Sequence, residues 1–163
     1  MEYVAQQNIK KLCNFYVSDL HLSVMLLPYL NKQINEDVEI TTIFEKLEKE
    51  TIETILDKLN VKNKEKILNI NWFNSNIDTY DKIENTIEKD IKNNKKITII
   101  IGGNKSYILE NNKKILKYLE EKNTNSENIK IINCFNVEEV GTNMKSIVKE
   151  YDGILNTSGE IKI

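Results

Sequence analysis

Residues 96–106, KITIIIGGNKS, predict a buried β-strand that leads through a glycine turn into a helix. Residues 97–101 are isoleucine at every position but one, and such a β-branched run is typical of a strand covered on both faces, as in a parallel sheet. Gly102 and Gly103 then permit a tight turn or a close backbone approach. Between residues 108 and 119, apolar side chains recur at helical spacing. The stretch therefore predicts a strand, a turn and a helix in succession.

This arrangement presents free N–H groups and the positive end of a helix dipole to an anion. A phosphate loop, however, requires a lysine directly after its second glycine. Here Asn104 follows Gly103, and Lys105 comes one place later. The dinucleotide pattern G-x-G-x-x-G is also missing. A structural turn is therefore favoured, and a degenerate nucleotide-binding site at Gly102, Gly103, Asn104 and Lys105 is the alternative.

Length and composition are those of one ordinary globular domain. The chain has 163 residues, of which 40% are hydrophobic and 29% charged, with a formal net charge of −2; this is enough chain for a proper core. Lysines and acids are interspersed, and no arginine occurs. We expect no nucleic-acid partner, because such binders carry a concentrated basic surface. An anion site would use lysine, amides or backbone N–H groups in place of the bidentate arginine clamp.

A reduced, cytoplasmic setting is predicted from the cysteines and from the lack of apolar segments. Cys13 and Cys134 lie far apart and outside any C-x-x-C pattern, which disfavours a disulfide framework or a structural zinc site. No apolar run approaches the roughly 20 residues that span a bilayer, and the first residues, MEYVAQQNIKK, contain no apolar signal segment. Asparagine, lysine and isoleucine are over-used, which we interpret as an AT-rich codon bias.

Strand and helix patterns alternate along the chain. Strands are expected at residues 12–17, 38–44, 67–70, 97–101 and 129–134, with short terminal strands at 153–156 and 160–163. Helices are expected between them, the last over residues 137–151, and Pro28 should kink or break the first one. Such alternation predicts a parallel or mostly parallel sheet. We expect an α/β fold: a single three-layer domain over residues 1–163 with five to seven strands flanked by helices.

Candidate binding residues follow from the rule that ligands bind outside the carboxyl ends of the strands in open α/β sheets. The predicted strands place there Ser18, Asp19, His21, Glu45, Asn71, Trp72, Gly102, Gly103, Asn104, Lys105, Asn136 and Glu138. Trp72 can stack on a ligand, although packing in the core is the commoner role of a lone tryptophan. Asp19 can instead cap the first helix. The predicted ligand contacts are Asp19, His21, Trp72, Gly102, Gly103, Asn104, Lys105 and Glu138.

Catalysis is not predicted. Residues 17–21, VSDLH, are similar to the strand and S-D-x-H motif that open metallophosphoesterases, but those enzymes need further histidines and His21 is the only one here. A Ser-His-Asp or Cys-His set would also depend on His21, without a nucleophile motif to support it. We therefore expect a protein without enzyme activity, metal or cofactor.

Short segments carry a resemblance to a known family: residues 12–16 (LCNFY), Asp19, and residues 27–30 (LPYL), followed by residues 34–43 and 132–135. The chain resembles the MEDS domain, the sensory domain of methanogen and methylotroph regulators of the DcmR type. The resemblance implies a RecA/KaiC-type α/β fold without a working P-loop. It also implies a ligand-sensing module, usually joined to a DNA-binding or kinase domain.

Two family histidines are replaced in this chain. The leading one aligns with Lys11 and the late one with about Tyr151, so if these histidines contact a ligand in the family, this chain has lost that contact. We expect a stand-alone cytoplasmic sensory or regulatory module that binds an unknown small molecule or a separate output protein at the carboxyl edge of its sheet. The alternatives are a protein-interaction or assembly domain without ligand, and the degenerate nucleotide-binding protein. A homo-oligomer is left open, and no membrane partner is expected.

Overall fold

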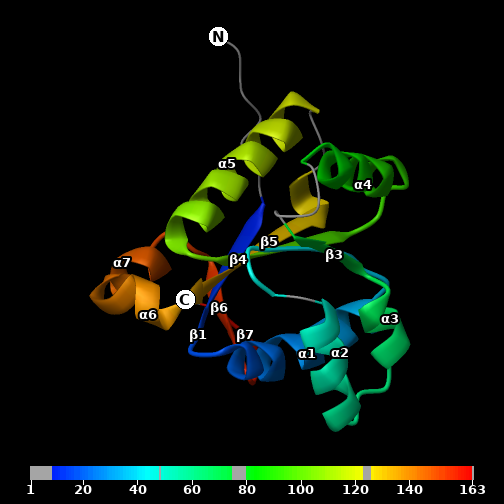
Figure 1. The fold of residues 1–163 in the computed structure, drawn as a ribbon. Coiled ribbons are helices and arrows are strands. Elements are labelled where there is room, and N and C mark those ends of the chain that lie inside the picture. The colour runs from blue at the N-terminus through cyan, green and yellow to red at the C-terminus, as the bar shows by residue number, and fades with distance from the viewer. Residues whose placement is uncertain (1–8, 48, 75–79, 123–125, 163) are drawn as a thin grey trace.

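Seven strands form one sheet in the computed structural model, which describes residues 9–47, 49–74, 80–122 and 126–162 (Figure 1). The strands are β1 Lys10–Tyr16, β2 Glu39–Phe44, β3 Asn71–Asn74, β4 Ile97–Gly103, β5 Ile129–Asn136, β6 Gly153–Asn156 and β7 Gly159–Lys162. Their order across the sheet is β3-β2-β4-β5-β1-β6-β7. β1 to β6 run parallel and β7 returns antiparallel to β6. The predicted mostly parallel α/β sheet is confirmed.

Helices cover both faces of the sheet and give the fold three layers (Figure 1). They are α1 Asp19–Asn35, α2 Lys49–Lys58, α3 Lys64–Leu68, α4 Tyr80–Lys92, α5 Lys105–Glu121, α6 Val137–Val140 and α7 Met144–Val148, with 3-10 turns η1 Ser126–Asn128 and η2 Gly141–Asn143. One face packs against α1, α2 and α3, and the other against α4, α5, α6 and α7. Within the described residues, every helix is too short or too polar to cross a membrane.

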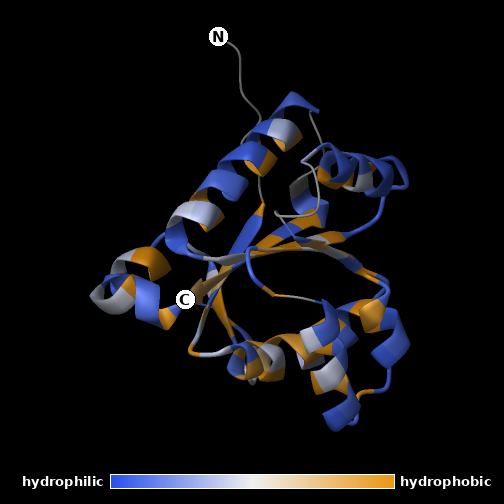
Figure 2. Ribbon diagram, in the orientation of Figure 1, coloured by the Kyte–Doolittle hydropathy of each residue, from blue (hydrophilic) through white to orange (hydrophobic). Residues whose placement is uncertain are grey.

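The isoleucines of β4 explain why this strand lies inside the sheet. Ile100 belongs to the core beneath α1, α2 and α3, whereas Ile99 and Ile101 belong to the core beneath α4 and α5. All three are fully buried, and burying one such side chain stabilises the fold by about 1.5–3 kcal/mol. Figure 2 shows the hydrophobic colouring concentrated on the strands and on the helix sides that face them. The prediction of a strand covered on both faces is confirmed.

Two predicted elements are wrong. The expected strand at residues 67–70 is the end of α3 and a turn, and β3 begins only at Asn71. The α3 sequence KEKIL consists mainly of good helix formers, and Ile67 is its buried anchor. The expected helix over residues 137–151 is divided into α6, η2 and α7. Gly141, where the division begins, has a φ of +49°, a left-handed conformation that ends a helix.

Pro28 does not break the first helix, because α1 is continuous from Asp19 to Asn35. The proline is exposed on one side of the helix, so the carbonyl of Val24, which has no helical donor at position 28, can accept a hydrogen bond from water. Leu22, Leu26 and Leu30 are buried on the opposite side. Their packing against the sheet outweighs the loss of one helical hydrogen bond.

Cys13 and Cys134 lie on neighbouring strands but on opposite faces of the sheet. In the β1–β5 register, Cys13 pairs with Asn133 and Asn14 pairs with Cys134. Because successive residues of a strand point to opposite faces, the two thiols are separated by the sheet. Both cysteines are free and fully buried, and burial raises the pKa of the Cys13 thiol to about 11. This geometry excludes a disulfide between them.

Three sequence-based expectations fall partly outside the described residues. Ile77, expected in a helix, and Ile163, expected at the end of the last strand, are not described. The polar stretch 121–128 predicts a surface loop, of which residues 123–125 are likewise not described; the flanking residues belong to α5 and η1. The terminal strands are otherwise confirmed as the β6–β7 hairpin.

Candidate functional site

Glu45 and Asn104 join the ends of β2 and β4 at the carboxyl edge of the sheet. The backbone N–H of Asn104 donates to Glu45 Oε1 over 3.3 Å, and its side-chain amide donates to Oε2 over 3.0 Å. The Glu45 N–H in turn donates to the carbonyl of Gly102 over 3.0 Å. The carboxylate of Glu45 is therefore fixed in front of the first residues of α5.

Gly102 and Gly103 are the last two residues of β4 and not a turn, which corrects the expectation from the sequence. A side chain on Gly102 would overlap the ring of Phe44. Gly103 has a φ of +152°, and a Cβ there would stand 2.8 Å from Glu45 Cβ and 2.9 Å from the Tyr107 ring. The two glycines thus allow Phe44 and Glu45 to approach the β4 backbone.

The N-terminus of α5 is capped within the chain. Asn104 is the N-cap residue, and its Oδ1 accepts hydrogen bonds from the Tyr107 N–H and from the Ser106 hydroxyl, each over 2.8 Å. Lys105 is exposed as the first helical residue. Because the Glu45 carboxylate already lies at this positive helix end, the position at which an anion would bind contains a negative charge of the chain itself.

A small cavity of about 130 Å³ lies at this edge of the sheet. Its lining includes four of the predicted site residues, namely Asp19, Gly102, Gly103 and Asn104. It also includes Tyr16, Glu45, Lys46 and Glu139. Burial, more than the neighbouring acidic groups, raises the pKa of the Tyr16 hydroxyl. Since small-molecule sites occupy roughly 300–1,000 Å³, this cavity is too small for a nucleotide.

Asp19 and His21 belong to the first turn of α1. Ser18, and not Asp19, is the N-cap residue, because its hydroxyl accepts the His21 N–H over 3.1 Å. Asp19 is the first helical residue, where a carboxylate favours the helix dipole. His21 Nδ1 accepts the N–H of Val17 over 3.0 Å, so His21 acts as a local structural residue. Among the described residues, no three or more His, Cys, Asp or Glu side chains are grouped to hold a metal.

Trp72 and Glu138 do not line the small cavity. Trp72 lies on β3 itself, its indole Nε1 donates to the carbonyl of Ile67 over 2.9 Å, and its ring stacks on Phe44 with centroids 6.5 Å apart. These contacts anchor α3 and β2, which is the packing role anticipated for a lone tryptophan. Glu138 is exposed on α6, where its N–H donates to the N-cap side chain of Asn136 over 3.0 Å.

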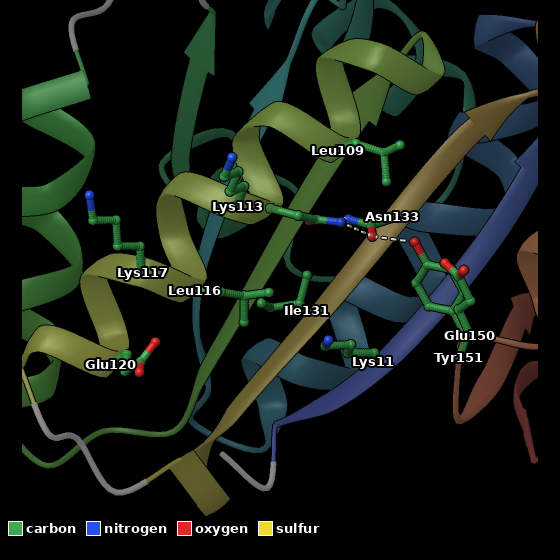
Figure 3. A pocket seen from close by; sticks show the side chains of 11 residues that line it. Lys11, Leu109, Lys113, Leu116, Lys117, Glu120, Ile131, Asn133, Glu150 and Tyr151 are labelled. Carbon is green, nitrogen blue, oxygen red and sulfur yellow. Dashed lines mark hydrogen bonds between the residues drawn. The ribbon is translucent and has the colours of Figure 1, made fainter. Parts of the chain in front are cut away.

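A larger cavity, of about 550 Å³, lies over β1 and β5 between α5 and the segment before β6 (Figure 3). It is lined by Lys11, Leu109, Asn112, Lys113, Leu116, Lys117, Glu120, Ile131, Asn133, Glu150 and Tyr151. This volume falls within the range of small-molecule sites. None of the predicted site residues lines it. The two positions at which the MEDS resemblance places histidines, Lys11 and Tyr151, do.

The floor of this cavity is a hydrogen-bonded network of three side chains. Asn112 and Asn133 form a reciprocal amide pair, with N···O distances of 2.7 and 2.9 Å, and the Tyr151 hydroxyl donates to Asn133 Oδ1 over 2.6 Å (Figure 3). Asn133 is 1% exposed. Burial raises the pKa of Tyr151, which keeps the hydroxyl protonated as a donor. The network ties α5, β5 and the segment before β6 to one another.

The sequence analysis does not predict this site, because the frequent asparagines are interpreted there as codon bias. The usable signal was the position of Asn133 inside the apolar strand IKIINCFN, with Asn112 on the apolar side of a helix. An asparagine at such positions needs a hydrogen-bonding partner, since an unsatisfied buried amide is costly. The strand-end rule also directed attention to the edge of the sheet, whereas this cavity lies on its face.

Comparison with protein-family models gives no match, and no curated protein sequence matches the chain. Among solved structures, the chain is similar to the crystal structure of the RadB recombinase. That comparison has a TM-score of 0.48 and 12% sequence identity, and it covers 88% of this chain and 72% of the RadB chain.

Proposed function

We propose that this chain is a non-enzymatic regulatory module that senses a small ligand and passes its state to a separate partner protein. The observation that carries this proposal is the cavity of about 550 Å³ with its network of Asn112, Asn133 and Tyr151. An apolar wall with a few fixed polar groups is the usual composition of a small-molecule site. The two positions at which the MEDS resemblance places histidines also line this cavity, although Lys11 and Tyr151 stand there in this chain.

The position of the cavity also offers a route by which binding can change the surface of the protein. Tyr151 is followed by Asp152, which exchanges two hydrogen bonds with the Lys11 backbone, of 2.8 Å through its N–H and 2.9 Å through its carboxylate. The β6–β7 hairpin begins at Gly153. A ligand that binds one arrangement of this segment more tightly would shift the hairpin with it, since only differential affinity moves such an equilibrium.

Thermal unfolding in the presence of a panel of small metabolites, nucleotides included, tests the proposal. A ligand at 100 times its Kd stabilises the native state by about 2.7 kcal/mol, which corresponds to a rise in Tm of roughly 5–10 °C for a domain of this size. The variant Leu109→Glu, altered at a half-exposed position of the cavity wall, should show a smaller rise with the same compound. If no compound raises the Tm of the wild type, the sensory proposal fails.

A second candidate function is self-assembly, and the exposed apolar side of α1 favours it. Leu20 and Val24 are 60% and 39% exposed and lie one turn apart, and Val17 before them is 58% exposed. Two copies could pack these residues against each other about a two-fold axis. Sedimentation at 10–200 μM tests this: the wild type should dimerise, and Leu20→Ser/Val24→Ser should not. A monomeric wild type over this range removes the candidate.

A further inference from the structure

The four lysines between residues 113 and 122, on α5 and at its C-cap, fall into two groups. Lys114 and Lys122 form ion pairs with Glu110 and Glu88, at 3.3 and 3.8 Å. Lys113 and Lys117, which lie one turn apart and line the 550 Å³ cavity, form no ion pair within the part of the chain that the structure describes. Two lysines without an acidic partner among the described residues thus line the cavity from α5.

A third cation reinforces this charge. Lys11 lines the cavity from β1, beneath α5 (Figure 3), and it too forms no ion pair among the described residues. Two acids, Glu120 and Glu150, also line the cavity, so the lining carries three positive and two negative side chains in a protein whose overall charge is −2. Because the chain has no arginine, these lysines are the side chains available to bind an anion here.

The floor of the cavity is a less suitable place for that anion than the lysines are. Asn133 Oδ1 already accepts two hydrogen bonds, from Asn112 and Tyr151, and Asn112 Oδ1 accepts one from Asn133. The donors of this network are largely used within it, so a charged group buried among them would lose its hydration without enough replacement. An anionic group is therefore better placed at the rim, where the lysine ammonium groups meet water.

The wall between rim and floor is apolar. Leu116 of α5 and Ile131 of β5 stand next to each other at its centre, and the Tyr151 ring lies beyond them (Figure 3). Leu109 adds a leucine that is 45% exposed. Covering such surface contributes about 25 cal/mol per Å² of apolar area removed from water. A ligand with an apolar body would gain this energy while keeping its charged end at the lysines.

We propose that the cavity binds an amphipathic monocarboxylate, with its apolar body against Leu116, Ile131 and Tyr151 and its carboxylate at Lys113 and Lys117. This names the ligand class for the sensory function proposed above and depends on that function. The body is either a compact aromatic ring system or a short aliphatic chain. Either kind of molecule combines an apolar body with one carboxylate, and the experiment below distinguishes the two bodies.

Isothermal titration of the full chain with 1-naphthoate and with octanoate tests the proposal, and 1-naphthylmethanol serves as the uncharged analogue. At least one carboxylate should bind, roughly ten-fold more tightly than the alcohol, and more weakly as salt is raised from 20 to 300 mM. The carboxylate that binds identifies the body. In Lys113→Gln/Lys117→Gln its affinity should fall about ten-fold. Both positions lie on the outer part of α5, so folding should persist, and urea unfolding checks this.

The matched control is Lys58→Gln/Lys62→Gln, which removes two exposed lysines on the opposite face of the sheet. It changes the net charge equally but lies away from the cavity, so it should leave the affinity within two-fold of the wild type. Equal weakening in both double variants would overturn the assignment to this cavity, and so would equal affinity of the alcohol. If neither carboxylate binds while the metabolite panel yields a stabilising ligand, the ligand class is wrong and the sensory function stands.

Discussion

Asn104 donates two hydrogen bonds to the carboxylate of Glu45, one from its backbone over 3.3 Å and one from its side chain over 3.0 Å. The acceptor follows β2 and the donor follows β4, two neighbouring strands of the sheet. A carboxylate of the chain thereby lies where a strand–helix junction would receive a phosphate. A nucleotide phosphate at this place would meet a negative charge and a cavity of only about 130 Å³.

The first prediction concerns the nucleotide-binding alternative at Gly102, Gly103, Asn104 and Lys105. We expect ATP and GTP at 1 mM to bind neither the wild type nor Lys105→Ala, because the Glu45 carboxylate repels the phosphates. Equilibrium dialysis with labelled nucleotide measures this. Binding by the wild type that is lost in Lys105→Ala would contradict the prediction and restore the nucleotide-binding function.

The second prediction concerns the stability that the Glu45–Asn104 contact supplies. One hydrogen bond to a charged group contributes about 1.5–3 kcal/mol. Because the backbone bond is long and Glu45 is only partly buried, Glu45→Ala should lower the free energy of unfolding by about that amount for the two bonds together. Urea unfolding measures it. The control is Glu53→Ala, an exposed glutamate on α2, which should change stability by no more than about 0.5 kcal/mol. Equal effects of the two substitutions would show that the contact adds nothing.

The third prediction concerns the close approach of Gly102 and Phe44. A Cβ on Gly102 would overlap the Phe44 ring, so Gly102→Ala should destabilise the protein by about 1–3 kcal/mol through overpacking. In a Phe44→Leu background the smaller side chain leaves room, and the same substitution should cost clearly less. The double-mutant cycle in urea isolates this coupling. Additive effects would place the cost of the alanine elsewhere.

Most of the fold could be predicted because its strongest patterns are local. The isoleucines of β4 and the helical spacing in α1 and α5 each identify their own element, and the alternation of elements implies a parallel sheet. The predicted element boundaries are wrong where a short apolar run is too short to distinguish the period of a helix from that of a strand. Ile67, at the end of KEKIL, is a helical residue because α3 packs it into the core, which no local pattern specifies.

The candidate site was harder to predict, because it depends on residues that the sheet brings together from distant parts of the chain. Because β2 and β4 are neighbouring strands, Glu45 lies beside Asn104. The N-terminus of α5, which the sequence suggests as an anion site, is therefore already occupied by a carboxylate of the chain. Tyr151 can donate to Asn133 of β5 because β6, which follows Tyr151 in the chain, pairs with β1, the neighbour of β5. Strand order is a global property that the sequence left open, so these contacts could not be derived from spacing alone.

The fourth prediction concerns the pH dependence of the stability that Glu160 of β7 contributes through its side-chain contacts. Glu160 accepts hydrogen bonds from Tyr29 over 2.7 Å and Lys10 over 2.9 Å, and it also pairs with Lys130. Burial alone would raise the pKa of Glu160, but the bonds from Lys130, Lys10 and Tyr29 outweigh it and lower the pKa to about 2. The lowered value means that the folded state favours the carboxylate, so this stabilisation is complete above about pH 4.5, the ordinary value for glutamate.

The matching variant is Glu160→Gln. It should be less stable than the wild type at pH 7, and the difference should shrink as the pH falls from 4.5 towards 2, because the wild type loses the same charge. Urea unfolding of both proteins at pH 7, 4.5 and 3 measures this. An exposed glutamate changed in the same way, Glu53→Gln, should show no such trend. A difference that stays constant from pH 7 to pH 3 would assign the effect of Glu160 to packing and not to its charge.

The fifth prediction concerns Asp90, near the end of α4. Its pKa is shifted in the opposite direction to that of Glu160, so the dependence of stability on pH is also opposite. Its side chain is buried, and its Oδ2 has no hydrogen-bond partner among the described residues. Burial, followed by the negative charge of Glu39, raises the pKa of Asp90 to about 6, although Lys89 and Lys95 partly oppose this. A raised pKa means that ionisation costs more in the folded state, so stability falls as the pH rises from about 4 to 6 and the penalty is complete above that.

Asp90→Asn removes this penalty while keeping the shape of the side chain. The variant should be more stable than the wild type by about 1–3 kcal/mol at pH 8, since each unit of pKa shift corresponds to about 1.4 kcal/mol. At pH 4, where Asp90 is largely protonated in the folded wild type, the two proteins should have similar stability. Asp81→Asn, at an exposed position in the first turn of the same helix, is the control; it should lower stability at pH 8 by about 0.3–1 kcal/mol, because it removes a charge that the helix dipole favours, and so it should shift stability in the opposite direction. Destabilisation by Asp90→Asn at pH 8 would mean that the ionised carboxylate has a favourable role in the fold.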